Sequence, residues 1–491
     1  MINDSEYPKW ERITEKIIVL NAILQPLLDV LTSVGVKLDF TVTAGVLARV
    51  ALVVYLSVYE LFLYKGRYRK HVHIGFCLLA LYLVAFAALS FAHGGISCAV
   101  GNLVESVKLV FFALIASALV LSYLEDRIVI SDNELNWIAV GYAAIILIAY
   151  LTGTSNVSYN REAFGDYTFG YGYNGWFSAA NETSNVINCT APILIGISLN
   201  KIFNLEMEKG WRKAIPFFYL GVTVFAACMI GTKLGYVMVF VCIALCTGWG
   251  AIVGVVKKNR KYFRIAAVGF LCCASMLAVY KYTPMAAIIE DQFVPLEDKN
   301  SEQYATAMSL FDEVKIREGA ESDPRFEGKT DWLYEMTDED PVLSKLNWVM
   351  SRRISRVAIV IQEYIEGDAA VKLLGVGYRT NESNYFRIDQ PIEMDALSVL
   401  VRHGIIGFAL LVLPCIAAFV YAIVLFFRNI KEIMSNLMLC VRLYSVIIMF
   451  IISNIAGHVI TAPSISFCVA AVYLLMLYKM KHYSEEKEEY I

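Results

Sequence analysis

The stretch KLGYVMVFVCIALCTGWGAIVGVV at residues 233–256 is an apolar run whose single charge, Lys233, stands at its start. A helix of about 20 such residues crosses the roughly 30 Å hydrocarbon core of a bilayer. Similar runs recur along the chain, and the predicted spans are 16–36, 41–64, 73–92, 100–124, 134–151, 182–200, 214–230, 233–256, 265–282, 396–427, 438–457 and 462–479. The sequence therefore predicts an all-α polytopic membrane protein with about 12 transmembrane helices.

The composition favours the same fold class. Hydrophobic residues make up 58% of the 491 positions, charged residues make up 18%, and the mean hydropathy is +0.57. Soluble globular domains are about half apolar and about a quarter charged. The formal net charge of −3 is too small for binding nucleic acid by bulk electrostatics.

The cysteines and the N-terminus predict no special covalent chemistry. Several of the 11 cysteines, among them Cys189 and Cys242, lie inside apolar runs, where cysteine acts as a small hydrophobic residue. No C-x-x-C pair occurs, so we expect no metal site, disulfide framework or cofactor. The first 16 residues are polar and mixed in charge, so we expect no signal peptide before the first span.

Basic loops predict the orientation, because cytoplasmic loops carry an excess of Lys and Arg. If the N-terminus is cytoplasmic, every dense basic short loop falls on the cytoplasmic side. These loops contain Lys65, Arg67, Arg69, Lys70, Lys209, Arg212, Lys213, Lys257, Lys258, Arg260, Lys261, Arg264, Arg428, Lys431, Lys479 and Lys481. We therefore expect both termini to be cytoplasmic.

The spans divide the chain into three parts. Residues 1–282 hold about nine spans, residues 283–395 form a long polar segment outside, and residues 396–491 hold about three spans and a cytoplasmic tail. A second external segment, 152–181, is rich in Gly, Tyr and Asn.

The segment 283–395 is too long for a simple connector. Amphipathic stretches at 301–318 and 351–367 predict a partly helical extracytoplasmic cap, with a solvated loop as the alternative. The cap is favoured by aromatic residues that can pack, namely Trp332, Tyr334, Trp348 and Tyr364.

Ionisable residues within the spans gather toward the predicted outer side. They are Asp29, Arg49, Glu105, Lys108, Lys233, Asp395, Arg402, His403 and His458. Such residues are costly in lipid and usually face a cavity or a partner. A secondary transporter places its polar site near the midplane, so this asymmetry favours an enzyme that acts on a lipid-embedded substrate with a polar head. The alternative is a set of structural ion pairs, such as Asp29 with Arg49 and Glu105 with Lys108.

A first motif, GYNGWFSAANETS at 172–184, lies where an external loop turns into a helix. Asn181 or Ser178 is predicted to cap that helix, whose free N–H groups and dipole favour a nearby anion. The alternative is an ordinary helix start.

A second motif, GTKLGY at 231–236, lies at the outer end of a span. Lys233 beside small residues suits a phosphate at headgroup level, although the spacing is not that of a P-loop. The alternative is a snorkelling lysine.

A third group of residues runs from the long external segment into the next span. Its members are Arg352, Arg353 and Arg356, then LGVGYR at 374–379, EMD at 393–395 and RHGIIG at 402–407. Clustered arginines match phosphate or pyrophosphate oxygens, and a carboxylate at the mouth of a span can act as a general base. The alternatives are a solvated basic helix face and an ordinary acid at a helix start.

Taken in this order, the motifs resemble those of the bacterial O-antigen ligase/O-antigen polymerase (Wzy-like) superfamily over roughly 170–480. The matching elements are Gly-x-Phe to Asn at 175–181, Gly-Thr-Lys at 231–233, the arginine helix with Gly-x-Gly at 375–377, and Gly-Ile-Ile-Gly at 404–407. The resemblance implies a GT-C-type fold and metal-independent, inverting glycosyl transfer from a glycan on undecaprenyl pyrophosphate. It also implies that arginines hold the pyrophosphate and that an outer-face residue activates the acceptor hydroxyl.

Two positions depart from the ligase pattern. Ligase-like members place a His before the glycine that opens the final motif, with ten residues between the two, and this chain has Glu393 at that position. They often have an Arg three residues before the Gly-x-Phe glycine, where this chain has Gly172. A chain with an acidic residue in place of this His more closely resembles the polymerases of capsular or exopolysaccharide synthesis. Glu393 and Asp395 both remain candidates for the base.

The leading hypothesis is a polysaccharide polymerase of the bacterial cytoplasmic membrane, which moves a growing glycan from undecaprenyl pyrophosphate to a lipid-linked repeat unit. Arg353, Arg356 and Lys233 are predicted to bind pyrophosphate. Further binding candidates are Arg352, Arg379, Arg402, His403, Asn181 and Arg49. Expected partners are lipid-linked glycans, membrane lipids, a flippase and a chain-length regulator. The alternatives are a ligase that attaches finished polymer to another acceptor, and a lipid-linked oligosaccharide flippase or 12-span carrier.

Overall fold

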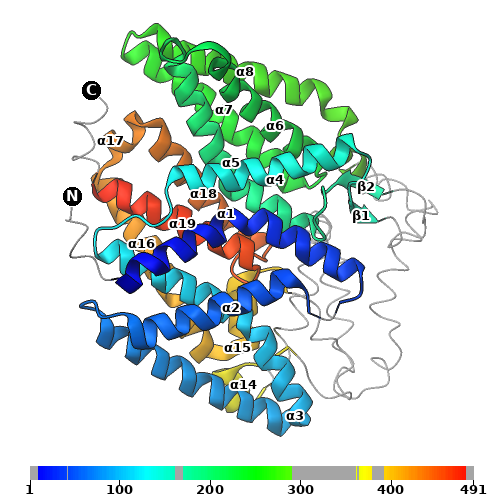
Figure 1. The fold of residues 1–491 in the computed structure, drawn as a ribbon, viewed down its shortest axis with the longest axis vertical. Helices are drawn as coiled ribbons and strands as arrows, with labels where there is room; N and C mark the ends of the chain where they lie inside the picture. Colours follow the sequence, from blue (N-terminus) through cyan, green and yellow to red (C-terminus); the bar gives the residue numbers. More distant parts are fainter. Residues whose placement is uncertain are drawn as a thin grey trace.

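The structure is a computed structural model, and it describes residues 9–40, 42–160, 170–289, 361, 364–365, 367–378 and 392–482. This part of the chain is almost entirely helical (Figure 1). The one exception is an antiparallel pair of short strands, β1 (Val157–Asn160) and β2 (Gly170–Tyr173), which lies within the predicted external segment 152–181.

The long helices follow the predicted spans closely. They are α1 (Lys9–Lys37), α2 (Ala44–Val58, continued by a π-helical turn to Leu63), α3 (Arg69–Leu124), α4 (Asp132–Leu151), α5 (Ala180–Phe203), α6 (Ile215–Met229), α7 (Lys233–Val256), α8 (Arg260–Val279), α15 (Asp395–Leu411), α16 (Leu413–Arg428), α18 (Leu437–Ile455) and α19 (Pro463–Lys481). The short helices are α14 (Ala369–Leu374) and α17 (Ile430–Ser435), with 3-10 turns at Leu205–Met207, Gly210–Ala214 and Tyr280–Tyr282.

Within the described residues, ten helices are long and apolar enough to cross a membrane. The count becomes eleven if α15 and α16, which are bent by 48° at their junction, form one broken span. The predicted all-α polytopic membrane fold is thereby confirmed.

Helix α3 has 56 residues, about twice what one crossing needs, and it folds back on itself. Its backbone leaves the helical region at Gly94 and Gly95 (φ 71°). Asn102 Nδ2 donates to Ser90 Oγ at 2.9 Å, whereas 12 residues of straight helix would separate them by about 18 Å. The two arms correspond to the separate spans predicted at 73–92 and 100–124.

We expect Gly95→Ala to lower the stability of the protein by about 1–2 kcal/mol, because an L-residue pays that cost in the left-handed region. No neighbouring atom lies close enough to confuse the result with a clash. Thermal unfolding of the purified protein in detergent measures the change. The matched control is Gly75→Ala, also in α3 and with open space around it, which should be neutral or stabilising. Equal melting of the two variants would contradict a turn enforced at Gly95.

The loops of the described chain lie on two faces. On one face Arg67 Nη2 donates to the Leu124 carbonyl (3.1 Å) and Lys481 pairs with Asp126 (2.5 Å). We call it the basic face, and its loops are 64–68, 125–131, 204–214, 257–259 and 429–436. Helix α1 begins and α19 ends there, so both ends of the described chain share this face. Its assignment to the cytoplasm remains a prediction.

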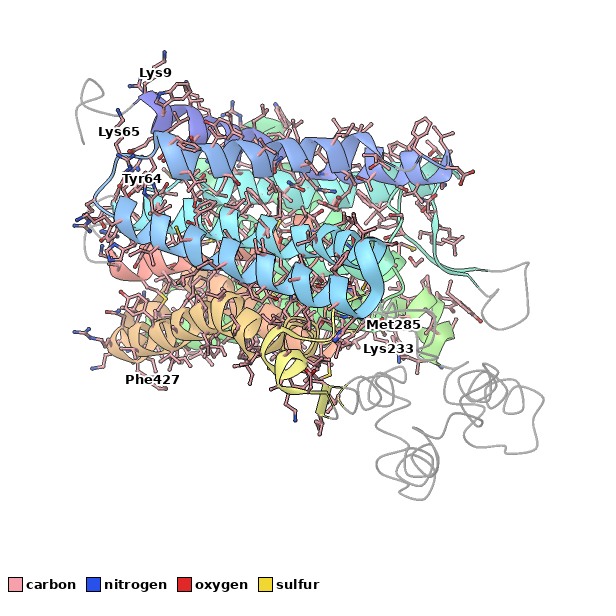
Figure 2. The ribbon with its side chains drawn as sticks, turned by 90° about the horizontal axis from the view of Figure 1, so that it is seen from below. Lys9, Tyr64, Lys65, Lys233, Met285 and Phe427 are labelled. Atoms are coloured by element: carbon pink, nitrogen blue, oxygen red, sulfur yellow. The ribbon has the colours of Figure 1, made fainter. Side chains whose placement is uncertain are left out.

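The other face, here called the opposite face, carries the motif residues. Figure 2 separates the two ends of the bundle, with Lys9, Tyr64, Lys65 and Phe427 at the basic face and Lys233 and Met285 at the opposite face. The predicted clustering of the sequence motifs at one side of the membrane is therefore reproduced by the fold.

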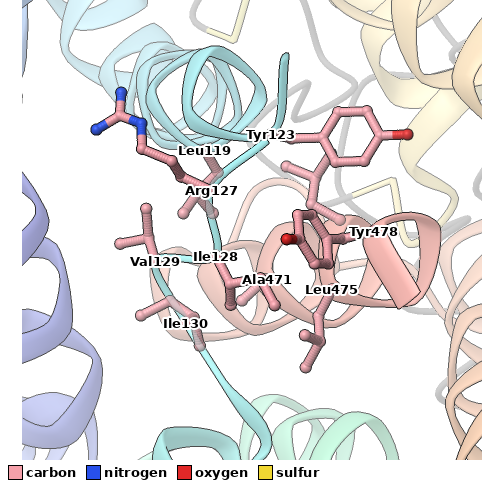
Figure 3. A pocket seen from close by; sticks show the side chains of 10 residues that line it. Leu119, Tyr123, Arg127, Ile128, Val129, Ile130, Ala471, Leu475 and Tyr478 are labelled. Atoms are coloured by element: carbon pink, nitrogen blue, oxygen red, sulfur yellow. The ribbon is translucent and has the colours of Figure 1, made fainter. Parts of the chain in front are cut away.

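Charges at the basic face are matched locally. Arg127 pairs with Glu11 (2.8 Å), Glu15 (2.7 Å) and Glu125, which ties the start of α1 to the end of α3. Arg127 also borders a narrow groove (Figure 3), whose walls include Leu119, Tyr123, Ile128, Ala471 and Tyr478. Three carboxylates around one guanidinium make this groove a poor site for an anionic ligand.

Helix α5 lies at the centre of the bundle. In its most apolar stretch 78% of the residues are buried, against 17% for α3. Small residues allow close approach: a Cβ on Gly196 would lie 2.6 Å from Val441 of α18. Nearby, Ser445 Oγ donates to the Cys189 carbonyl at 2.5 Å. This central position makes α5 the reference for the site at its N-terminal end.

Candidate functional site

The first two motifs meet at the start of α5 and α7. Gly172 (φ 78°) lies so close to the end of α6 that a Cβ there would be 2.3 Å from the Ile230 carbonyl oxygen. Ser184 Oγ, one turn into α5, hydrogen-bonds Thr232 Oγ1 at 2.6 Å. Segments that are about 50 residues apart in sequence are thus joined at the opposite face.

The predicted capping of α5 is wrong. The helix begins at Ala180, its N-cap is Ala179, and that residue makes no side-chain cap. Asn181 lies inside the first turn, and the Thr183 hydroxyl donates back to the Ala179 carbonyl (2.9 Å). A residue within the first turn cannot cap it, because capping requires the non-helical position before it.

The second motif builds a helix start around Lys233. Gly231 adopts φ 79°, and Thr232 Oγ1 accepts from the Gly235 N–H at 3.1 Å as the N-cap of α7. Lys233 is the first helical residue and is partly exposed. The positive end of the helix dipole and an ammonium group therefore coincide at this point, which favours an anion.

The third motif is an interlock between backbone segments. Helix α15 is broken at Gly404 (φ 65°), and the broken turn presents carbonyls to the preceding chain. The Val376 N–H donates to the Val401 carbonyl and the Gly377 N–H to the Arg402 carbonyl, each at 3.0 Å. A Cβ at Gly375 would lie 2.2 Å from the Arg402 carbonyl oxygen, so only glycine fits at position 375. Gly-x-Gly and the final Gly-Ile-Ile-Gly are therefore two halves of one structure.

Arg402 and His403 are packed inside this interlock. His403 is 1% exposed and hydrogen-bonds Tyr82 through Nδ1 (2.7 Å) and Tyr378 through Nε2 (2.9 Å). Arg402, 2% exposed, lies 4.7 Å above the Tyr378 ring. Burial raises the pKa of the Tyr378 phenol well above its usual range, although Arg402 opposes the shift. These contacts make both residues parts of the scaffold in this conformation.

Asp395 holds the loop between α18 and α19, residues 456–462. Its Oδ2 accepts from the Val459 N–H (2.8 Å), the Ile460 N–H (3.1 Å) and Ser453 Oγ (2.9 Å). The side chain is 1% exposed, whereas Glu393 is partly exposed at the mouth of α15. Of the two acids predicted as a base, only Glu393 is open to an incoming substrate.

We expect Asp395→Ala to destabilise the protein by about 3 kcal/mol or more, because a buried donor left without an acceptor costs about 1–3 kcal/mol and three donors lose theirs. Thermal unfolding in detergent tests this. Ser453→Ala, which removes one of the three bonds and leaves both N–H groups satisfied, should cost about 1 kcal/mol. A wild-type melting temperature for Asp395→Ala would show that the carboxylate does not anchor the loop.

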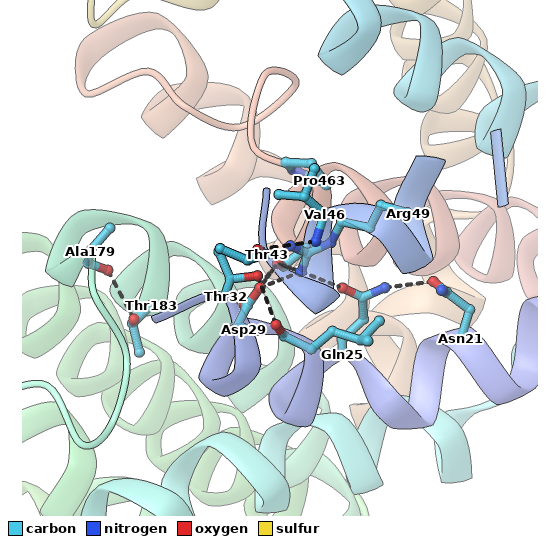
Figure 4. Close-up of polar contacts among 12 residues, drawn as sticks. Asn21, Gln25, Asp29, Thr32, Thr43, Val46, Arg49, Ala179, Thr183 and Pro463 are labelled. Carbon is cyan, nitrogen blue, oxygen red and sulfur yellow. Dashed lines mark hydrogen bonds and ion pairs between the residues drawn. The ribbon is translucent and has the colours of Figure 1, made fainter. Parts of the chain in front are cut away.

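Arg49, a predicted pyrophosphate ligand, belongs to a buried network (Figure 4). It pairs with Asp29 and donates to Gln25 (3.2 Å) and Ser464 (3.0 Å). Ser464 and Tyr142 also donate to the Asp29 carboxylate. The network joins α1, α2, α4 and α19, so the structural ion pair between Asp29 and Arg49 is observed.

The second proposed ion pair, between Glu105 and Lys108, is also present, at 2.8 Å. It differs from the first in its exposure, because 53% of the Lys108 side chain is accessible. An accessible charge on a membrane-spanning helix requires water or a polar partner beside it. The Glu105 carboxylate is such a partner for Lys108.

Two further residues of this region were missed among the predicted site residues. Glu182, in the first turn of α5, is exposed. His458 is partly exposed in the loop 456–462. Glu182 stands inside the first motif, next to Asn181, and an exposed acid beside a helix start was the signal available in the sequence. His458 lies in no motif.

The loop with His458 also contacts α5, one residue after the first motif, and the third motif. Asn185 Nδ2 of α5 donates to the Gly457 carbonyl (3.3 Å). A Cβ at Gly457 would lie 2.7 Å from Glu393 Cα, so the loop rests on the residue before α15. The three motifs are thus brought together around the N-terminal end of α5, at the opposite face.

The remaining predicted residues fall as follows. Lys233, Glu393 and Asn181 are partly exposed at the opposite face. Arg352, Arg353, Arg356 and Arg379 lie outside the described residues, as does the predicted helix 301–318. The described end of the predicted cap, residues 367–378, packs against α3 and α15. Nowhere in the described ranges do three His, Cys, Asp or Glu side chains gather to hold a metal ion.

The comparison with protein families agrees with this arrangement. Residues 11–483 match the family described as O-antigen ligase like membrane protein. The chain belongs to this family. Membership implies a membrane enzyme of glycan assembly, and the predicted superfamily is confirmed at that level. No curated protein matches the chain.

Proposed function

We propose that this O-antigen ligase-like protein is a polysaccharide polymerase. It transfers a growing glycan from undecaprenyl pyrophosphate to a lipid-linked repeat unit at the outer face of the bacterial cytoplasmic membrane, with GT-C-type, inverting chemistry. The observation that carries the proposal is the meeting of all three motifs around the N-terminal end of α5. Residues that serve one reaction must lie within reach of one substrate.

The donor side of the reaction needs cations for the diphosphate. Lys233 stands at the N-terminus of α7, where the helix dipole and the ammonium group both favour an anion. Arg353 and Arg356 are proposed to complete the diphosphate site, with Arg352 and Arg379 as additional ligands. Arginine forms bidentate bonds with phosphate oxygens, which suits a leaving group that gains charge in the transition state.

The transfer itself is balanced without a further reagent. The acceptor hydroxyl oxygen bonds to the anomeric carbon, the bond from that carbon to the diphosphate oxygen breaks, and the diphosphate leaves with the electron pair. The hydroxyl proton passes to a base at the protein. Glu393 and Asp395 were predicted for this step, and the closed environment of Asp395 leaves Glu393 as the accessible acid.

The function is tested by incubating the purified protein in lipid nanodiscs with a lipid-linked repeat unit as both donor and acceptor. A ladder of products that differ by one repeat is expected. A ligase, the alternative within the same superfamily, would leave the repeat unit unextended and would move preformed polymer to a second acceptor instead. A protein that does neither, but moves the lipid-linked unit across the bilayer, would overturn transferase activity altogether.

Lys233→Ala is expected to weaken donor binding by about tenfold or more, since a hydrogen bond to a charged group contributes about 1.5–3 kcal/mol. The measurement is the donor concentration for half-maximal extension. Lys213→Ala, on the basic face, removes an exposed lysine far from the motifs and should leave that concentration unchanged. An equal effect of both substitutions would point to general charge rather than a diphosphate site.

A further inference from the structure

Two connections at the basic face, between α5 and α6 and between α7 and α8, carry a large excess of positive charge. We call residues 205–212 and 257–264, which include the first turn of α8, the cationic patch. The sequence of the patch contains two acids, Glu206 and Glu208. Its cations are Lys209, Arg212, Lys257, Lys258, Arg260, Lys261 and Arg264. This balance contrasts with the surroundings of Arg127 on the same face, where three carboxylates meet one guanidinium.

One carboxylate joins the two segments of the cationic patch. Glu206 pairs with Lys261 Nζ and with Arg264 Nη1, each at 2.5 Å. Aromatic packing supports this contact, because the ring of Tyr262 lies 4.7 Å from the ring of Phe203 at the end of α5, measured between ring centres. The two segments therefore form one surface, and the remaining cations of the patch are all exposed on it.

Exposed apolar side chains stand directly beside these cations. Trp211 is 76% exposed and directly precedes Arg212. Val256, at the end of α7, is 75% exposed and directly precedes Lys257. Tryptophan and long cationic side chains are typical of the boundary between acyl chains and head groups. A lipid surface offers anionic groups and acyl chains in adjacent layers, so this alternation favours lipid over an acidic protein as the partner.

The cationic patch lies where lipid can reach it. Helices α6, α7 and α8 form one end of the described bundle (Figure 1). In the most apolar stretch of α8, 17% of the residues are buried, against 78% in α5. A spanning helix with so little protein around it has lipid as its main neighbour. The head groups of the adjoining leaflet therefore lie beside the first turn of α8, which belongs to the patch.

We propose that the cationic patch binds the head groups of anionic phospholipids in the adjoining leaflet. Its exposed Lys and Arg side chains bind the phosphate oxygens, and the Trp211 ring inserts beside them among the upper acyl carbons. About four to eight Lys and Arg residues directly beside a membrane span are typical of such surfaces. The surface is distinct from the site of the proposed transfer, because Lys233 and the motifs lie at the opposite face.

The test titrates phosphatidylglycerol or phosphatidylcholine into the full-length protein in detergent and follows the melting temperature, which a ligand of the folded state raises. Phosphatidylglycerol should stabilise the wild type at about tenfold lower concentration than phosphatidylcholine, and added salt should remove this difference. The variant Lys209→Gln/Arg212→Gln/Arg260→Gln should need about tenfold or more phosphatidylglycerol for the same shift, since each cation beside an anionic surface contributes about fivefold. Without lipid it should melt as the wild type does, because all three side chains are exposed.

Trp211→Ser tests the apolar part of the surface. It keeps every cation of the patch, and it should also raise the phosphatidylglycerol concentration needed for half of the shift. Inorganic phosphate, which has the charge of a head group without acyl chains, should not stabilise the wild type at the same concentrations. Wild-type behaviour of Trp211→Ser would overturn the insertion of its ring. Equal stabilisation by inorganic phosphate would overturn the assignment to lipid.

Two further variants serve as matched controls. Lys209→Arg keeps the charge and should respond to phosphatidylglycerol as the wild type does. Lys65→Gln/Arg69→Gln/Lys70→Gln removes three exposed cations around the start of α3 on the same face, and it should also respond as the wild type does. An equal loss in this variant would assign the effect to the total charge of the face. That result, or equal stabilisation of the wild type by both lipids, would overturn the proposal.

Discussion

The carboxylate of Asp395 links the parts of the molecule that form the opposite face. It stands at the first residue of α15 and accepts from the backbone of the loop between α18 and α19, far away in sequence. In the low-dielectric interior of a membrane protein an unpaired carboxylate is costly, and unpaired backbone donors are costly as well. Each side of this contact therefore fixes the other. The loop in turn rests on Glu393 and bonds to α5, so one buried acid determines where the end of the third motif meets the first.

Around this contact the site is built mainly from backbone. Gly172 approaches Ile230, Gly375 approaches Arg402, and Gly457 approaches Glu393, each closer than a Cβ would permit. These approaches let loops of widely separated sequence lie against one another at the end of a helical bundle. The glycines in the motifs are thus positions where two segments of the chain pass too close for a side chain. The charged side chains beside them, such as Lys233 and Glu182, supply the polar character of the face.

The sequence predicts the spans well, because the length and apolarity of each helix are local properties set by the bilayer. Even the turn within α3 follows from a run too long for one crossing. The site is predicted less completely. The start of α5 depends on which residue leaves the helical region first, so the expected cap at Asn181 is wrong. The pairing of Arg49 with Asp29 could be proposed but not decided, since either residue could equally have faced a ligand. His458 adopts a left-handed backbone conformation (φ 58°) in a loop held by Asn185 and Asp395, and no local pattern marks it.

The two faces differ in how their charges are used, and this difference bears on the class of protein. At the basic face Arg127 is surrounded by three carboxylates, and Arg442 is paired with Asp132, so the charges there join helices. At the opposite face the side chains of Glu182 and Lys108 are accessible, whereas the ion pair of Asp29 and Arg49 is largely buried. A carrier that alternates between two sides needs polar groups available from both. Exposed charges also occur at the basic face, for example at Lys65 and Lys213, so the faces are distinguished by the motifs, which meet at the opposite face. That placement suits an enzyme whose lipid-anchored substrate presents its head group at a single membrane surface.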